Sequence, residues 1–395
     1  MKISPFAVEQ WMNAYETKCR YNLAETCVES LTIAELLEIA GQRATILEEL
    51  LPLKMTYGAI EGSDRLRAAI AGLYVSQSIA NVLVTHGAIG ANALVYQALV
   101  ANGDRIVTIV PTYQQHYSIP ESLGADVQRL HLHAENGYLP DMDELRRLVT
   151  PGTKLIAFSN PNNPTGSLMD RALLEEVVRI AASVNAYILS DEVYRGTAQE
   201  HDALTPSIAD LYPKGISTGS MSKAFSLAGF RLGWICGPSE MLRAAELHRD
   251  YNTISVGILD DIFSSIALES RDKILARSRH LVRTNLATLD RWVQSESAFS
   301  YVKPRAGTVT LLNYAVDMPS QEFCTRLLEE TGVLFTPGSA FELEGCVRIG
   351  YANGSEIVEE GLRRTSGFLR RHVSWRMGVN KSRRSRPKRL ARGET

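Results

Sequence analysis

The chain has 395 residues, of which 45% are hydrophobic and 22% are charged, and its formal net charge is −2. This is the composition of a globular protein large enough for one big domain and a smaller one. The five cysteines form no C-x-x-C pair, and no apolar run has the length of a signal peptide or membrane span, so we expect a cytoplasmic protein with reduced thiols, no metal site and no membrane contact.

A large domain is predicted over residues 53–290. We expect residues 1–52 to form an N-terminal segment that packs on the smaller domain or on a partner subunit. From about Asn81 to Cys236, short apolar runs alternate with helical patterns. The runs are Val82–Val84, Ile106–Val110, Leu155–Phe158, Tyr187–Leu189 and Ile216–Thr218. Buried strands separated by helices predict a mostly parallel sheet that is covered on both faces.

A smaller α+β domain is predicted over residues 291–372. A long helical stretch without Pro or Gly, roughly Leu259 to Val293, leads into it. The elements that follow are a strand at Gly307–Tyr314, a helix at Gln321–Glu330, strands near Val333 and at Val347–Ile349, and a helix from Ser355 to about Arg371.

Residues 373–395 form a basic tail that we expect to be disordered. Between Arg376 and Thr395 the sequence has eight Lys or Arg and one Glu. Such a run could bind nucleic acid, but a basic terminal segment with no aromatic residue beyond Trp375 is typical of a solvated tail.

A lysine motif, Ser220–Trp234, follows the last of the predicted strands of the large domain. Lys223 is flanked by the hydroxyls of Ser220 and Ser222, and Arg231 follows eight residues later. This pattern suits an amine that condenses with an aldehyde beside a bound phosphate, because the hydroxyls and the guanidinium can bind phosphate oxygens. Lys223 would then be a covalent catalyst. Taken alone, the motif also fits a surface lysine in a polar loop.

Two other predicted strands end in residues that suit a pyridine cofactor. Asp191 can pair with a protonated ring nitrogen and Tyr194 can donate to a phenolate oxygen, although Asp191 could instead cap the next helix. In the turn-rich string Ser159–Gly166, Asn163 could donate to the same oxygen or serve only as a turn residue. Both segments lie at the strand ends where open α/β sheets bind ligands.

Two further strand ends add a phosphate site and an aromatic side chain. After Val82–Thr85, the chain enters a helix through small residues, so the free backbone N–H groups of Ala88 and Ile89 can hold a phosphate. Tyr113 follows the next strand and could stack on a flat ring, or it could belong to the core.

In this order, the motifs resemble those of the class I/II aminotransferases, enzymes of pyridoxal 5'-phosphate (PLP) fold type I. The resemblance runs from about Tyr57 to Tyr351 and implies an α/β fold: a large domain with a mostly parallel seven-stranded sheet between helices, plus a smaller α+β domain. Tyr57–Arg67 resembles the family motif whose tyrosine reaches the cofactor phosphate of the neighbouring subunit. The resemblance therefore implies a homodimer with shared active sites.

The same resemblance implies a role for each of these residues. Lys223 carries the cofactor as a Schiff base, Asp191 pairs with the pyridine nitrogen and Tyr113 stacks on the ring. The phenolate oxygen is bound by Asn163 and Tyr194. The residues implied to hold the phosphate are Ala88, Ile89, Ser220, Ser222, Arg231 and Tyr57 of the other subunit.

The resemblance also implies how substrate binds. Arg348, in Cys346–Tyr351, matches the arginine that grips the substrate α-carboxylate together with Asn163, a role that suits its fork of donors. Without the resemblance it would be a charge on a surface strand. The residues that select the substrate side chain come from loops and from the first fifty residues.

The reaction type stays open between three alternatives. The first is an aminotransferase that uses an amino acid and a keto acid. The second is a cyclase. Stretches such as Trp11–Leu36 and Gly307–Val309 resemble capreomycidine synthase, which cyclises a hydroxylated arginine by β-elimination and internal addition. The third is a non-catalytic PLP-binding sensor, which is disfavoured because only about fifty residues precede Tyr57, too few for a DNA-binding module and a linker.

Overall fold

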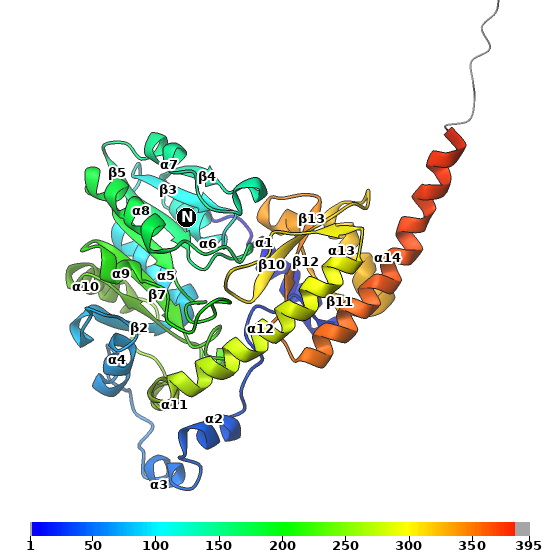
Figure 1. Cartoon of the computed structure of the whole chain (residues 1–395). Helices are drawn as coiled ribbons and strands as arrows, with labels where there is room; N and C mark the ends of the chain where they lie inside the picture. Colours follow the sequence, from blue (N-terminus) through cyan, green and yellow to red (C-terminus); the bar gives the residue numbers. More distant parts are fainter. Residues whose placement is uncertain (1, 384–395) are drawn as a thin grey trace, which may run out of the picture.

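The computed structural model describes residues 2–383, with side chains through His372. The larger part of the molecule is built on a seven-stranded sheet in the order β2-β8-β7-β6-β5-β3-β4 (Figure 1). Neighbouring strands are parallel except for β8, which is antiparallel to both β2 and β7. The predicted α/β fold with a mostly parallel sheet is confirmed.

Each of the five apolar runs lies in a strand of this sheet. The strands are β2 (Val82–His86), β3 (Arg105–Val110), β4 (Asp126–His131), β5 (Thr153–Ser159), β6 (Tyr187–Asp191), β7 (Gly215–Ser220) and β8 (Leu232–Cys236). The edge strand β4 has no apolar run, because Leu130 alone among its residues is buried.

Helices cover both faces of this sheet, which explains why its strands are apolar on both sides. In β3, Ile106 packs in a cluster with residues of α5 and α10, and its neighbour Val107 packs in a cluster with residues of α7 and α8. The helices of this part are α4 (Asp64–Ala71), α5 (Gly87–Leu99), α6 (Gln115–Ser122), α7 (Met142–Leu148), α8 (Arg171–Ser183), α9 (Ile208–Leu211) and α10 (Ser239–Arg249).

The smaller part contains an antiparallel sheet in the order β12-β13-β10-β9. Its strands are β9 (Phe299–Ser300), β10 (Val309–Tyr314), β12 (Thr336–Pro337) and β13 (Cys346–Gly350). Helices α13 (Ser320–Thr331) and α14 (Ser355–Arg383) pack against each other beside this sheet. Because α14 continues through Arg383, the first residues of the basic tail are helical; no proline occurs between Ser355, where α14 begins, and Pro387. Residues 384–395, the rest of the predicted disordered tail, lie outside the described residues.

The N-terminal segment packs on the smaller part of its own chain. Helix α1 (Ala7–Tyr15) places Trp11 in the same buried cluster as residues of α13 and β13, and β1 (Tyr21–Asn22) pairs in parallel with β11 (Val333–Leu334). Helices α2 (Ile33–Ala40) and α3 (Ile46–Leu50) follow and lead back to the larger part.

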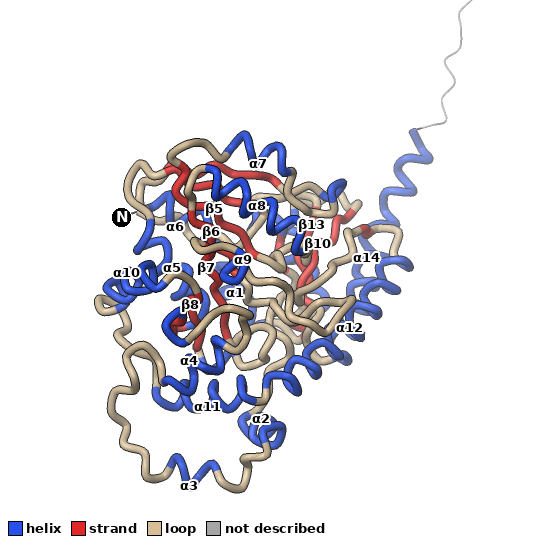
Figure 2. Tube along the Cα trace, turned by 60° about the vertical axis from the view of Figure 1, so that its left-hand side comes forward, coloured by secondary structure: helices blue, strands red, loops and turns tan. Residues whose placement is uncertain are grey.

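The predicted helical stretch Leu259–Val293 is two helices, α11 (Ile258–Glu269) and α12 (Arg271–Ser295). Ser270 separates them and has a φ of −102° and a ψ of 15°, outside the helical range. Helix α11 packs on α4 of the larger part, whereas α12 packs on α14 of the smaller part. The break therefore lets each helix pack on a different part of the molecule (Figure 2).

Residues 22–31, which we call the bridging segment, bond to both parts of the molecule. On the side of the smaller part, Gly350 N donates to Leu23 O at 2.7 Å and Glu29 N donates to Ala352 O at 2.8 Å. On the other side, Val28 N donates to Lys223 O at 3.3 Å. The bridging segment therefore fixes its own side chains next to Lys223.

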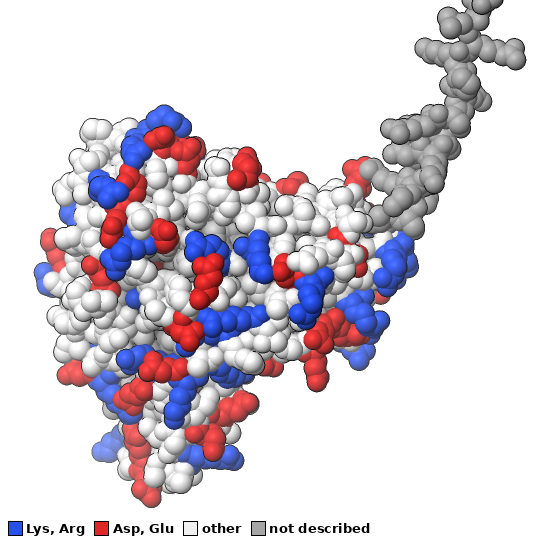
Figure 3. Space-filling view, viewed as in Figure 1, with Lys and Arg blue, Asp and Glu red and all other residues white. Residues whose placement is uncertain are grey.

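The surface carries charges of both signs. On the face shown in Figure 3, acidic and basic side chains are interspersed. Across residues 2–383, no helix combines the length and the apolar character needed to cross a membrane.

Candidate active site

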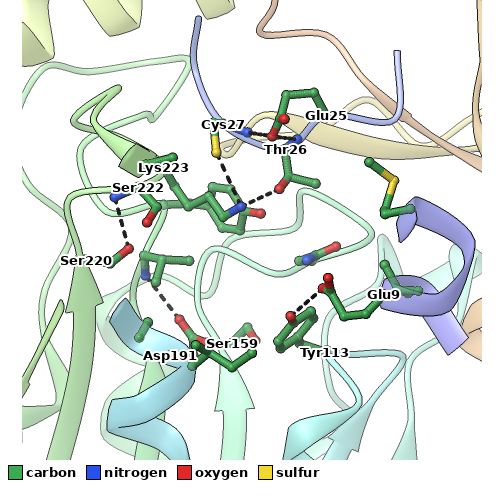
Figure 4. Close-up of a pocket in the computed structure, with 18 of the residues that line it drawn as sticks. Glu9, Glu25, Thr26, Cys27, Tyr113, Ser159, Asp191, Ser220, Ser222 and Lys223 are labelled. Carbon is green, nitrogen blue, oxygen red and sulfur yellow. Dashed lines mark hydrogen bonds between the residues drawn. The ribbon is translucent and has the colours of Figure 1, made fainter. Parts of the chain in front are cut away.

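A cavity of ≈ 280 Å³ lies where the larger part, the smaller part and the N-terminal segment meet (Figure 4). The carboxyl ends of β2, β3, β5, β6 and β7 all face this edge of the sheet, which is where open α/β sheets bind ligands. The predicted site residues that line the cavity are Ala88, Ile89, Tyr113, Asn163, Asp191, Tyr194, Ser220, Ser222, Lys223, Arg231 and Arg348. Tyr57 does not line it in this chain and is 74% exposed.

Lys223 follows β7 and reaches into the cavity (Figure 4). Its Nζ donates to Thr26 Oγ1 at 2.5 Å and lies 3.5 Å from Cys27 Sγ, both in the bridging segment. Burial disfavours the protonated amine, but Cys27, Tyr194 and Glu25 outweigh burial and raise the pKa of Lys223 above its ordinary value. In the chain by itself, these neighbours favour the protonated form of Lys223, and Thr26 holds its Nζ.

Asp191, at the end of β6, is fixed by a buried hydrogen-bond chain. Thr218 Oγ1 donates to Asn92 Oδ1 at 2.7 Å, and Asn92 Nδ2 donates to Asp191 Oδ2 at 2.9 Å. His116 Nε2 lies 3.7 Å from the same Asp191 oxygen. The next helix, α9, begins only at Ile208, which excludes the alternative that Asp191 is a helix cap.

An anion cradle forms where the start of α5 meets the loop after β7. Ala88 and Ile89 lie in the first turn of α5, whose backbone N–H groups point out of the helix end. Strand β8 lies between β2 and β7 and so brings this turn beside Ser220, Ser222 and Arg231. Arg231 Nη1 lies 3.4 Å from Ser222 Oγ. The helix end, the hydroxyls and the guanidinium together suit a phosphate.

Gly233 keeps this cradle closed, because a Cβ at this position would lie 2.3 Å from Gly87 C and 2.5 Å from Ala88 N. We expect Gly233→Ala to push the start of α5 away from Arg231 and to cost about 1–3 kcal/mol, as overpacking does. Thermal unfolding should show the loss of stability, and equilibrium dialysis should show weaker PLP binding. Gly229→Ala is the matched control, since a Cβ there meets nothing within 4 Å. Equal PLP affinity in both variants would contradict this role of Gly233.

Arg348, in β13, is a buried cation with no carboxylate partner among the residues whose side chains the structure describes. It is 2% exposed, and its donors reach neutral acceptors: Asn163 Oδ1 at 3.2 Å, Ala24 O at 3.1 Å and Thr336 Oγ1 at 3.1 Å. Its Nε has no hydrogen-bond partner in the described part of the chain. An unpaired buried charge is costly, so the cavity is suited to an anionic ligand at Arg348.

Tyr113 and Tyr194 are the two aromatic side chains among the predicted site residues that line the cavity. Tyr113 Oη donates to Glu9 Oε1 of α1 at 2.6 Å, and burial followed by Glu9 raises the pKa of Tyr113. Tyr194 is 1% exposed, and its hydroxyl has no hydrogen-bond partner among the described residues. The Tyr194 hydroxyl is thus placed to bond a ligand.

Sequence reasoning missed the contributions of α1, the bridging segment and α5. The missed cavity residues that carry polar groups are Glu9, Glu16, Glu25, Thr26, Cys27, Asn92, Gln115 and Ser159. The resemblance of Trp11–Leu36 to capreomycidine synthase indicated that the N-terminal segment matters for the site, but it did not indicate which residues of this segment line the cavity.

The chain matches the family described as aminotransferase class I and II over residues 46–363. The chain belongs to the class I and II aminotransferase family. Among solved structures, it is similar to a PLP-dependent aminotransferase from Streptococcus suis 89-1591, with 43% identity, a TM-score of 0.91 and coverage of 94% of this chain and 99% of that chain. This family membership makes the chain an enzyme of the transferase class with PLP as its cofactor.

Two other relatives show the range of this aminotransferase family. Capreomycidine synthase of Streptomyces vinaceus is 29% identical over 374 residues, which cover 93% of this chain and 95% of that protein. The PLP-dependent cyclase OrfR is 28% identical, with a TM-score of 0.87 and coverage of 94% of this chain and 98% of that chain. An aspartate aminotransferase of Pyrococcus horikoshii is 28% identical over 318 residues, 78% of this chain and 81% of that protein.

The cavity residues fit PLP. The cradle at α5 suits its phosphate, the unpartnered Tyr194 hydroxyl suits its phenolate oxygen, and the Asp191 carboxylate suits its ring nitrogen. Lys223 lines the same cavity and suits its aldehyde.

Proposed function

We propose that the chain is a PLP-dependent aminotransferase that acts on the amino group of an amino acid, with Lys223 as the residue that holds the cofactor covalently. The observation that carries the proposal is Arg348, a buried guanidinium without a carboxylate partner among the described residues, in the same cavity as Lys223. An amino acid carboxylate would supply the missing anion and would hold Cα close to the lysine.

In this proposal Lys223 moves the proton at Cα. When bound, PLP supplies an aldehyde that condenses with amines and a ring that accepts electrons. With a substrate amine in place of Lys223 at that aldehyde, the free Lys223 amine would act as a general base for the proton at Cα. Thr26 Oγ1, 2.5 Å from Nζ, holds the amine in place.

Asp191 would hold the pyridine nitrogen of PLP in its protonated form. Its carboxylate is buried, and Asn92 fixes its orientation through Nδ2. A fixed anion at this place stabilises a positive ring nitrogen without any rearrangement during the reaction.

Asn163 connects the two ends of the substrate site. Its Oδ1 accepts from Arg348, which leaves its Nδ2 as a donor for the phenolate oxygen. Arg348 and Asn163 therefore orient the substrate together, as the bidentate fork of a guanidinium allows.

A second candidate function is β-elimination and cyclisation of a hydroxylated arginine-type substrate. It is favoured by the similarity to two cyclising enzymes: capreomycidine synthase, 29% identical over 93% of this chain, and the PLP-dependent cyclase OrfR, 28% identical over 94% of this chain. Lys223, Asp191 and Arg348 would act in the same way at Cα in both reactions, so they do not separate the two functions.

A half-reaction separates the two functions. If the chain is an aminotransferase, purified holoenzyme mixed with its amino acid alone should form stoichiometric pyridoxamine phosphate, and a keto acid should restore the original absorbance. If it is a cyclase, a β-hydroxylated amino acid such as hydroxyarginine should lose water and form a ring with many turnovers and no keto acid. Mass spectrometry of the products decides between these outcomes, and multiple turnovers without a keto acid would contradict the aminotransferase.

We further propose a homodimer with shared active sites. Tyr57 lies outside the cavity of its own chain, and large apolar side chains around it in the sequence are exposed. These are Leu47, Leu51, Met55 and Ile60. A stretch of exposed apolar side chains suits a protein interface, from which Tyr57 could reach the phosphate of the partner subunit.

A further inference from the structure

Three carboxylates from the N-terminal segment line the cavity: Glu9, Glu16 and Glu25. Glu9 and Glu16, with Met12, lie on one side of α1 and the turn after it, at the spacing of a helix face. Figure 4 shows Glu9 and Glu25 on the same side of the cavity, away from Ser220 and Ser222. None of the three carboxylates forms an ion pair within 4.0 Å among residues whose side chains are described, although 24 such pairs occur among those residues.

Two of these carboxylates are held in place by neutral donors. Glu9 Oε1 accepts from Tyr113 Oη at 2.6 Å, and Glu25 Oε1 accepts from the backbone N of Thr26 at 2.7 Å and of Cys27 at 2.8 Å. Burial, followed by repulsion from Glu25 and Glu9, raises the pKa of Glu16. Glu16 is therefore repelled by the other two carboxylates, whereas Lys223 and the N–H groups of Thr26 and Cys27 outweigh burial and lower the pKa of Glu25. A cation placed beside Glu16 would relieve the repulsion on its carboxylate.

Among the described residues of this chain, the cations that line the cavity leave no partner for an acidic substrate side chain. They are Lys223, Arg231 and Arg348. Lys223 holds the cofactor, Arg231 lies in the phosphate cradle and Arg348 faces the α-carboxylate in the proposed function. A second substrate carboxylate would lie among Glu9, Glu16 and Glu25 and would be repelled.

Unpartnered buried groups independently indicate that a ligand enters this cavity. The Tyr194 hydroxyl and the Arg348 Nε are both buried and have no hydrogen-bond partner among the described residues. Glu9, Glu16 and Glu25 line the same cavity as Arg348, to which the proposed function assigns the α-carboxylate. An amino acid held at Arg348 would therefore have its side chain within reach of the N-terminal carboxylates.

We propose that the site selects amino acids whose side chain ends in a cation, a guanidinium or an ammonium, and that Glu9 and Glu16 accept its hydrogen bonds. The inference rests on the proposed function, because it places the α-carboxylate at Arg348. It holds for transamination and for cyclisation alike, since both begin with the same bound amino acid.

The contrasting possibility is that the carboxylates only balance the charge of Arg348 and Lys223. In that case they would favour no side chain, and neutral amino acids of equal size would bind as well as cationic ones. Isosteric pairs of amino acids separate the two possibilities: arginine with citrulline, in which a neutral urea replaces the guanidinium, and lysine with norleucine.

The experiment titrates the full-length holoenzyme with arginine, citrulline, lysine, norleucine and glutamate. The change in the visible absorbance of the cofactor gives Kd, and product analysis gives kcat and KM. We expect at least one cationic amino acid to bind at least about tenfold more tightly than its neutral isostere. The reason is that a charged donor forms a stronger hydrogen bond to a carboxylate than a neutral donor does. We expect glutamate to bind more weakly than either.

Substitutions of the carboxylates then test whether these residues cause the preference for cationic amino acids. Glu16→Gln is the first variant, because Glu16 is exposed enough for the substitution to leave the fold intact. It should raise Kd and KM for the preferred cationic amino acid by about tenfold, lower the effect of added salt on KM, and leave Kd for the neutral isostere unchanged. Glu9→Gln should act in the same direction and should also shift the cofactor spectrum, because Glu9 bonds to Tyr113. Glu135→Gln, at an exposed residue outside the cavity, is the matched control and should change nothing.

The outcomes separate this inference from the proposed function. If citrulline and norleucine bind as tightly as arginine and lysine, or if glutamate is preferred, the selectivity is overturned while the enzyme still acts on amino acids. If Glu16→Gln weakens the cationic and neutral isosteres equally, its role is structural and the assignment is overturned. If no amino acid changes the absorbance of the cofactor, both the proposed function and the selectivity are overturned.

Discussion

Lys223→Ala should abolish the visible absorbance of the covalently held cofactor and lower turnover by at least about 10⁴-fold, because one side chain supplies both the attachment point and the proton transfer at Cα. The bonds that join the Lys223 backbone to the bridging segment do not involve its side chain, so the fold should persist. Absorbance spectroscopy, borohydride reduction followed by peptide mass spectrometry, and thermal unfolding check these three expectations.

The matched control for this variant is Lys214→Ala. Lys214 is a partly exposed lysine just before β7, and its Nζ donates to Asn185 O at 3.0 Å. It should keep the absorbance and the turnover of the unmodified chain. A borohydride-stable adduct that survives in Lys223→Ala would show that a different lysine holds the cofactor, and the site proposed above would then be wrong.

Asp191→Asn should leave PLP bound but slow the removal of the Cα proton by about 10²–10³-fold, roughly the 3–4 kcal/mol lost when one preorganised electrostatic partner is removed. A neutral amide cannot stabilise a positive pyridine nitrogen, and Asn92 Nδ2, which now donates to Asp191 Oδ2 at 2.9 Å, would face an amide group. A primary kinetic isotope effect with Cα-deuterated substrate would locate the loss in this step.

Asp170→Asn provides the comparison for this substitution. Asp170 caps α8 through a hydrogen bond from Leu173 N to its Oδ1 at 2.9 Å, and asparagine caps helices about as well as aspartate. This variant should therefore have unchanged turnover. If Asp191→Asn and Asp170→Asn have similar turnover, Asp191 has no role in the removal of the Cα proton.

The sheet and its functional edge could be predicted because the signals for them are local. A buried strand is an apolar run, and residues at the carboxyl ends of parallel strands meet at one edge whatever lies between them. For this reason Tyr113, Asn163 and Asp191 could be placed together from the sequence, and the structure puts all three around one cavity. The sequence pattern could not show the break at Ser270, because it depends on which parts of the molecule α11 and α12 contact.

The residues that were missed bond to partners far away in the chain. Asn92 lies inside α5 and bonds to Asp191, 99 residues away, and Thr26 bonds to Lys223, 197 residues away. An asparagine in a helix and a threonine in a loop carry no chemical signature by themselves. Their positions become informative only when tertiary packing places them beside a lysine or a carboxylate.

The bridging segment and α1 precede residue 46, where the match to the family begins. The lysine, the phosphate cradle and Asp191 lie inside the matched region, whereas Glu9, Glu16 and Thr26 lie before it. The chemical step and the wall of the pocket that faces the side chain are thus encoded in separate stretches of the gene. A substitution within the first 45 residues can therefore change the side of the cavity formed by Glu9 and Glu16 without changing any residue of the catalytic edge of the sheet.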